Sequence, residues 1–170
     1  YHPQLYLPHT GVRLIDKCGT DEVIYFSGPI TRMLDEIENY ISLKAAKLNA
    51  AYPVAAVVEA IANAAVHRDY FSLAREIVIL IENNKIEISN PGATCSDEEM
   101  AELAEEYNPC RRNQWLYQRL LILDNKRRFL KTGTGMKNIY EAFKQHGGAK
   151  FMNNEKRNLF KVVLPGLMKY

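Results

Sequence analysis

The sequence predicts an α+β protein: a two-layer α/β sandwich with helices on one face of a mixed sheet. Two β-hairpins are indicated, because strand-like runs flank a polar turn in both "EIVILIENNKIEISNPG" and "AKFMNNEKRNLFKVVLP". The segments around them have helical hydrophobic spacing. After residue 52 the predicted order is helix, two strands, a variable segment, a glycine turn with a helix, and two strands. The chain has 170 residues, of which 47% are apolar, so it is long enough to bury a core.

The first fifty residues predict two short strands, "GVRLIDKCG" and "EVIYFSG", followed by a helix over residues 31–48. Apolar residues recur at helical spacing in that helix, and Thr31 is its expected N-cap. The next helix is expected to open at Tyr52-Pro53, because proline is favoured in the first helical turn. This helix is expected to run to about His67.

The later elements are punctuated by turn residues. The first hairpin is expected to turn at Asn83-Asn84, which tolerate the positive φ of a tight turn. Residues 93–132 form a charged segment with an acidic helix, "SDEEMAELAEE", and an amphipathic one, "NQWLYQRLLILD". This segment is long for a connection, so we expect it to be the most mobile or most irregular part after the N-terminus. A glycine turn that leads into a helix is predicted from "TGTGMKNIYEAFKQHGG".

The stretch "VVEAIANAAVHRDY", residues 57–70, carries a polar stripe on a helix that otherwise suits a core. At about 100° per residue, Glu59, Asn63 and His67 fall within an arc of about 80°. Ala56 and Ala60 lie beside the stripe. The solvated edge of an ordinary amphipathic helix explains this pattern. A chemical site explains it as well, since amide and carboxylate oxygens one turn apart can hold Mg²⁺, and the carboxylate can deprotonate a water.

Three later glycines can supply backbone N–H groups for phosphates. Gly92 follows the second strand of the first hairpin, and Gly133 and Gly135 open the helix after residue 132. A lone Gly-x-Gly pair also fits any loop that needs a positive φ. The order of acid–amide helix, strand-end glycine and helix-start glycines is more specific than any one of these features.

In that order, "EAIANAAVHRDY", "IEISNPG" and "GTGMKNI" resemble the C-terminal domain of RecG-related transcriptional regulators. That domain has the GHKL (Bergerat) ATPase fold of gyrase, Hsp90, MutL and histidine kinases. The resemblance covers about residues 52–165, and the segment before it resembles the tail of a Schlafen-like AlbA domain. It implies an AlbA tail with a connecting helix in residues 1–51 and a GHKL-like ATP-binding domain in residues 52–170. The chain begins without methionine, so we expect a piece of a longer protein.

The resemblance implies a catalytic residue and a metal ligand on the polar stripe. Glu59 matches the general base of the hydrolytic members, and Asn63 matches the asparagine that binds Mg²⁺ beside ATP. The implied cofactors are therefore ATP and Mg²⁺. Weak ATP hydrolysis is one of the activities that the resemblance leaves open.

The resemblance also implies a nucleotide-binding set. The stretch from Asn90 to Gly92 matches the adenine-recognising turn, although Asn90 replaces an aspartate and Thr94 replaces a second glycine. An asparagine oxygen accepts from the adenine amino group more weakly than a carboxylate does. Residues 93–132 correspond to the nucleotide lid. The implied cofactor-binding residues are Asn63, His67, Asn90, Gly92, Gly133 and Gly135.

Two functions remain open at this point. The first is an adenine-nucleotide-binding, regulatory domain of a RecG-related transcriptional regulator. The second is a degenerate GHKL-like fold without nucleotide binding, which serves dimerisation or contact with protein or nucleic acid. A side-chain-free groove in front of Glu59 and Asn63 favours the first, and a filled groove favours the second.

The expected partners follow from the resemblance and the composition. They are a nucleotide, DNA through parts N-terminal to this chain, and a second copy if the domain dimerises. No membrane is expected, because no run of 18 apolar residues exists. Three scattered cysteines without a CxxC pair indicate a reducing cytoplasm.

A basic cluster in residues 111–131 leaves three interpretations. It can be a solvated face, a lid cation that reaches the γ-phosphate, or a contact for nucleic acid. The net charge of only +2 does not favour nucleic acid. The cluster consists of Arg111, Arg112, Arg119, Lys126, Arg127, Arg128 and Lys131.

Overall fold

The structure is a computed structural model that describes residues 3–19, 21–94, 112–129 and 135–168. Within these residues the strands are β1 (Val12–Asp16), β2 (Glu22–Phe26), β3 (Ile77–Ile81), β4 (Lys85–Pro91), β5 (Lys150–Asn154) and β6 (Leu159–Pro165). They form one sheet in the order β2-β1-β3-β4-β6-β5. β1 and β3 are parallel, while every other neighbouring pair is antiparallel. The predicted mixed sheet is therefore confirmed.

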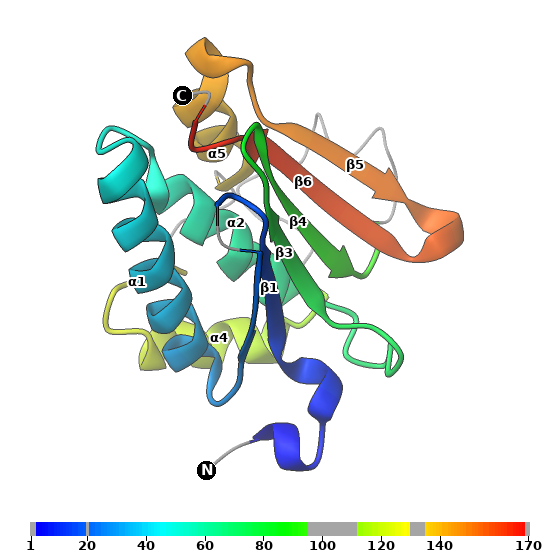
Figure 1. Ribbon diagram of the computed structural model, residues 1–170. Coiled ribbons are helices and arrows are strands. Elements are labelled where there is room, and N and C mark those ends of the chain that lie inside the picture. Colours follow the sequence, from blue (N-terminus) through cyan, green and yellow to red (C-terminus); the bar gives the residue numbers. More distant parts are fainter. Residues whose placement is uncertain (1–2, 20, 95–111, 130–134, 169–170) are drawn as a thin grey trace.

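Helices cover one face of this sheet (Figure 1). The described helices are α1 (Ile30–Leu48), α2 (Val54–His67), α4 (Gln114–Leu123) and α5 (Gly135–Phe143). Short 3₁₀ turns join the elements: η1 (Pro3–Leu5), η2 (Pro8–Thr10), η3 (Lys144–His146) and η4 (Glu155–Arg157). This arrangement confirms the predicted two-layer α+β architecture. Among the described residues, no helix has the length and apolar character needed to span a membrane.

Strand residues alternate between the helix layer and the open face of the sheet, as the period of two requires. In β3, Ile77, Ile79 and Ile81 are buried, while the residues between them are half-buried. The register places Ile79 beside Ile88 of β4, so the same face continues across the sheet. Asn90 follows Ile88 by two residues and therefore lies on the helix-covered side as well.

α2 is buried on nearly all sides. Ten of its fourteen residues are buried, because the helix lies among α1, α4, α5 and β4. Val57 and Ile61 are buried as predicted. The polar stripe does not form a solvated edge, however, since Glu59 is only 6% exposed. The alanines of α2 explain the difference: small side chains let neighbouring helices approach from directions that the sequence analysis left open to solvent.

The predicted helix starts and the first turn need small corrections. α1 begins at Ile30 with Pro29 at the N-cap, so Thr31 lies inside the first turn. In the β3–β4 hairpin, the Glu82 N–H donates to the Lys85 carbonyl at 2.9 Å, next to the Ile81–Ile86 pair, so the chain turns at Asn83-Asn84 as predicted. Neither asparagine at residues 83–84 has a positive φ.

Residues before α2 complete the sheet, which the sequence analysis did not anticipate. β1 lies between β2 and β3, and Leu14 pairs with Ile24 on one side and Ile79 on the other. Leu14 belongs to the same hydrophobic core as Ile79. The two parts predicted as residues 1–51 and 52–170 therefore share one core, and the division between them stays a prediction.

A buried ion pair fastens the end of β1 to α1. Asp16 is fully buried, and its Oδ2 atom lies 2.6 Å from Lys44 Nζ. The Tyr40 hydroxyl donates to the same oxygen at 2.7 Å, and the Cys18 N–H donates to Oδ1 at 2.8 Å. Burial and this hydrogen bond raise the pKa of the Tyr40 hydroxyl. Both oxygens of the carboxylate have partners, as a buried charge requires.

We predict that Asp16→Ala destabilises the protein by about 3–5 kcal/mol, because the Lys44 ammonium then loses the carboxylate that balances its charge in the interior. Urea unfolding followed by circular dichroism measures this loss. The matched control is Glu36→Ala, which removes an exposed Arg32–Glu36 pair of α1 and is expected to cost less than about 1 kcal/mol. Equal losses in the two variants would contradict the role of the buried pair.

Candidate functional site

The start of α5 packs directly against the polar side chains of α2. A Cβ atom on Gly135 would lie 2.9 Å from Asn63 Nδ2 and 3.1 Å from Glu59 Oε1. Only glycine therefore lets α5 approach this closely without displacing both side chains. The structure brings together three residues of the predicted site: Glu59, Asn63 and Gly135. Gly133 lies outside the described residues.

Glu59 and Asn63 differ in their surroundings. Asn138 Nδ2 of α5 donates to Glu59 Oε1 at 3.5 Å. Asn63 is half-buried, and its amide makes no hydrogen bond to a described residue. A buried carboxylate needs hydrogen bonds, so Asn138 is a member of this site that the sequence analysis missed. Its position three residues after Gly135, on the same side of α5, is the signal that points to it.

Asn90 presents an unused acceptor inside the protein. The residue is 2% exposed, and its Oδ1 atom has no hydrogen-bond partner among the described residues. Leaving a buried polar group unpaired costs about 1–3 kcal/mol, so such groups are rare in folded proteins and call for an explanation. Because Asn90 is the penultimate residue of β4 and lies on the helix side of the sheet, a bound molecule with an N–H donor is one explanation.

Gly92 is pressed against the end of α2. Its φ is +127°, and a Cβ atom there would lie 2.9 Å from both the Asp69 nitrogen and the His67 carbonyl oxygen. The Asp69 N–H donates to the Pro91 carbonyl at 2.6 Å. Glycine is required at this position on two grounds, since the backbone conformation and the close approach both exclude a side chain. The structure thus brings Gly92 to the backbone of His67.

The two glycines contact α2 at different points along its axis. Gly135 touches the side chains at residues 59 and 63, and Gly92 touches the backbone at residue 67. At 1.5 Å per residue, Glu59 and His67 are separated by about 12 Å along the helix. The predicted stripe therefore has one glycine contact near each end.

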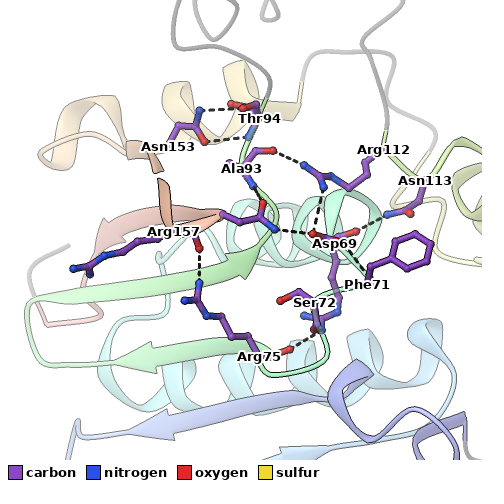
Figure 2. Close-up of polar contacts among 12 residues, drawn as sticks. Asp69, Phe71, Ser72, Arg75, Ala93, Thr94, Arg112, Asn113, Asn153 and Arg157 are labelled. Atoms are coloured by element: carbon purple, nitrogen blue, oxygen red, sulfur yellow. Dashed lines mark hydrogen bonds and ion pairs between the residues drawn. The ribbon is translucent and has the colours of Figure 1, made fainter. Parts of the chain in front are cut away.

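The end of α2 is held by buried polar contacts. Asn113 Nδ2 donates to the carbonyls of Val66 and Arg68, both at 2.7 Å, and so satisfies carbonyls that the last helical turn leaves free. The Arg68 side chain is fully buried and donates to the carbonyls of Ser72 and Arg75. Burial lowers the pKa of the Arg68 guanidinium. Figure 2 shows Asn113 and Arg75 on either side of the chain that follows α2, at Asp69 and Ser72.

The basic cluster is largely paired within the structure. Arg128 NH2 lies 2.6 Å from Asp124 Oδ1, and Arg128 NH1 lies 3.1 Å from Asp35 of α1. Lys126 Nζ lies 2.8 Å from Glu38 of α1. Burial by itself would raise the pKa of the Asp124 carboxyl, but the hydrogen bonds and charge of Arg128 lower it. None of the three interpretations from sequence anticipated that these cations connect α1 with the segment after α4.

Two further cations of the cluster also have partners. Arg119 lies over the Trp115 ring, 5.3 Å from its centroid. Arg112 donates to the Ala93 carbonyl at 2.6 Å and lies 3.7 Å from Asp69 Oδ2. Arg111 and Lys131 lie outside the described residues, as does most of the segment predicted to be a lid.

Comparison with known families assigns the chain. The family described as "Putative ATP-dependent DNA helicase recG C-terminal" matches residues 74–164, which is more than half of the chain, so the protein belongs to this family. The sequence-based resemblance is thereby confirmed. The matched region contains Asn90, Gly92 and Gly135 and begins after α2, so it does not include Glu59 or Asn63.

A solved structure supports the fold. The crystal structure of the DIP2311 protein from Corynebacterium diphtheriae superposes with a TM-score of 0.64 at 20% sequence identity. The similarity covers 94% of this chain but 34% of the DIP2311 chain, so the present chain spans about a third of that protein. At this identity the likeness shows the fold alone. No curated protein matches the sequence.

The two glycine contacts predict different effects of alanine on stability. Gly92→Ala places a side chain against backbone atoms at a positive φ and is expected to cost about 1–3 kcal/mol or more. Gly135→Ala meets only the ends of two side chains, which can rotate away, and alanine favours a helix by about 0.5–1 kcal/mol. Thermal unfolding is expected to show a lower Tm for the first variant and a Tm near that of wild type for the second. A Tm lowered equally in both would contradict this geometry.

Proposed function

We propose that this domain binds an adenine nucleotide with Mg²⁺ along α2, between the end of β4 and the start of α5. The observation that carries the proposal is the buried acceptor of Asn90, which has no partner among the described residues and lies near the end of β4, next to the glycine turn at residue 92. An adenine amino group is a donor that satisfies such an acceptor. Membership of a family described as ATP-dependent supports the same ligand.

On this proposal, the phosphates lie at the Glu59 end of the polar stripe on α2. α5 presents its first turn there, and free N–H groups at a helix start favour anions. Gly135 has no side chain of its own where this turn packs against Glu59 and Asn63. The separation of about 12 Å along α2 places the proposed base contact and the proposed phosphate contact at different points along the helix.

The residues present fit a Mg²⁺ ion that retains most of its water. Mg²⁺ takes oxygen ligands and commonly uses one or two protein side chains beside phosphates. The Asn63 amide makes no hydrogen bond to a described residue, and the Glu59 carboxylate lies one turn away. When bound, Mg²⁺ neutralises phosphate charge. Asn63 would hold the ion through its amide oxygen.

Hydrolysis is a separate step that rests on Glu59. Its carboxylate is buried beside the start of α5, where water is restricted and Asn138 orients one oxygen. In that position it accepts a proton from a water that attacks the terminal phosphoryl group, and the nucleoside diphosphate leaves. We further propose that the nucleotide-bound domain acts as the regulatory part of a DNA-binding regulator in the cytoplasm.

Calorimetric titration with a non-hydrolysable ATP analogue tests the proposal. Wild type is expected to bind with micromolar to millimolar affinity. Asn63→Ala removes one amide oxygen, so its affinity is expected to fall about tenfold with Mg²⁺ present and to match that of wild type when EDTA replaces the metal. Equal affinity of both proteins at saturating Mg²⁺ would remove the metal role of Asn63.

Glu59→Gln separates binding from turnover. The change keeps the size of the side chain and an acceptor for Asn138, so nucleotide affinity is expected to stay within about threefold of wild type. Any phosphate release should fall about 100-fold or more, because the proton acceptor is gone. Phosphate release undiminished in this variant would rule out Glu59 as the base.

Asn90→Ala tests the base contact. Loss of one neutral hydrogen bond is expected to weaken binding of the ATP analogue by about 5–10-fold. Affinity for Mg²⁺-tripolyphosphate, which has no base, should not change. Ser89→Ala, on the opposite face of β4, is the matched control and should behave as wild type for both probes. An unchanged analogue affinity in Asn90→Ala would exclude the contact.

A further inference from the structure

Asp69, just after α2, joins two separate parts of the fold around the Gly92 turn. Its N–H donates to the Pro91 carbonyl at 2.6 Å. Its Oδ2 atom accepts from Asn158 Nδ2, also at 2.6 Å, and its Oδ1 atom accepts from the Phe71 N–H at 3.0 Å. Both carboxylate oxygens therefore have partners within the protein, and the residue has no oxygen left uncommitted for a ligand.

Asn158 connects Asp69 to the residues that follow β4. The Gly92 N–H donates to the Asn158 carbonyl at 3.0 Å, and the Ala93 N–H donates to Asn158 Oδ1 at 2.9 Å. Asn158 has a φ of +47°, a left-handed conformation that asparagine adopts more readily than most residues. One asparagine in the β5–β6 connection thus bonds to Asp69, Gly92 and Ala93 together.

Arg112 and Asn113, the two residues just before α4, contact the same junction. Arg112 NH2 donates to the Ala93 carbonyl, and Arg112 NH1 faces Asp69 Oδ2. Asn113, the next residue, donates to the carbonyls at the end of α2. Ala93 and Arg112 therefore lie close together beside the same carboxylate. Figure 2 shows Asp69 between Ala93, Arg112 and Asn113.

The carboxylate is held in its charged form at this junction. Burial alone would raise the pKa of Asp69, but the hydrogen bonds from Asn158 and Phe71 and the charge of Arg112 lower it. Thr94 and Asn153 add a paired contact beyond the junction, with N–O distances of 3.0 and 3.2 Å. A connected set of this kind is more rigid than its separate bonds would be.

We propose that Asp69 is a positioning residue, which acts through Asn158 to hold the turn at residues 90–93 against the end of α2. The inference rests on the proposed function in one respect, namely that this turn carries the base-recognising Asn90. Asp69 does not touch the nucleotide. It sets the place of the turn, so its loss should weaken recognition of the base and leave recognition of the phosphates unchanged.

Asn158→Gly is the sharpest test variant. Glycine retains the left-handed backbone and the carbonyl that accepts from Gly92, and it removes only the two side-chain bonds. Asn154→Gly is the matched control, because this exposed asparagine ends β5 next to the same connection and its side chain accepts from the nearby Arg157 N–H. Asp69→Asn is the second test variant, since it removes the charge and one of the two acceptors.

Amide hydrogen exchange provides a readout that is independent of ligand. In Asn158→Gly and in Asp69→Asn, exchange of the Gly92 and residue 69 amides is expected to quicken about tenfold or more. The Asn154→Gly control should match wild type. Because both changes break the same contact, the double variant should exchange no faster than the faster single variant. Wild-type exchange rates in both single variants would overturn the inference.

Titration with two probes then separates positioning from general loosening. Both test variants should bind the ATP analogue about tenfold more weakly than wild type and bind Mg²⁺-tripolyphosphate equally well. An equal loss for the two probes indicates a merely structural role and overturns the inference. If wild type binds neither probe, the proposed function fails, while faster exchange in both test variants still supports the ordering of the turn by Asp69.

Discussion

The close approach of α2 to its neighbours is the constraint on which this structure depends. Alanines along the helix let α1, α5 and the sheet come near from several sides, so that ten of its fourteen residues are buried. Glycines stand at two points where another chain segment meets α2 at short range, Gly92 against backbone atoms and Gly135 against side-chain ends. Glu59 is buried for this reason, and the stripe that contains it is an interior feature rather than a surface one.

Buried polar groups in this fold divide into two kinds. Asp16 and Asp124 each face a cation from the same or a neighbouring element, and all four groups serve to fasten helices in place. Asn90 differs, because its acceptor is unpaired within the described residues. Groups of the first kind stabilise the fold, because each of these carboxylates is paired with a cation. The second kind has no structural benefit of its own, which is why it carries the argument for a ligand.

Family membership and the folded unit do not have the same extent. The family match begins at residue 74, whereas the sheet includes β1 and β2 and its covering layer includes α1 and α2. Leu14 and Ile79 belong to one core although 65 positions of sequence order separate them. The region of recognisable sequence is therefore smaller than the region that must fold together. A nucleotide site formed between α2 and the matched region would depend on both.

The sequence by itself determined the local elements and their order. Hydrophobic periodicity predicts α1, α2 and both hairpins, and the motifs around Glu59, Gly92 and Gly135 predict which segments matter, because these signals lie in consecutive residues. Only the tertiary structure decided that Glu59 is buried, that Asn90 has an unpaired oxygen and that Asp69 bonds to Asn158. Each of these facts depends on which distant residues come into contact. Periodicity reports which face of an element is apolar, but it does not report what packs against that face.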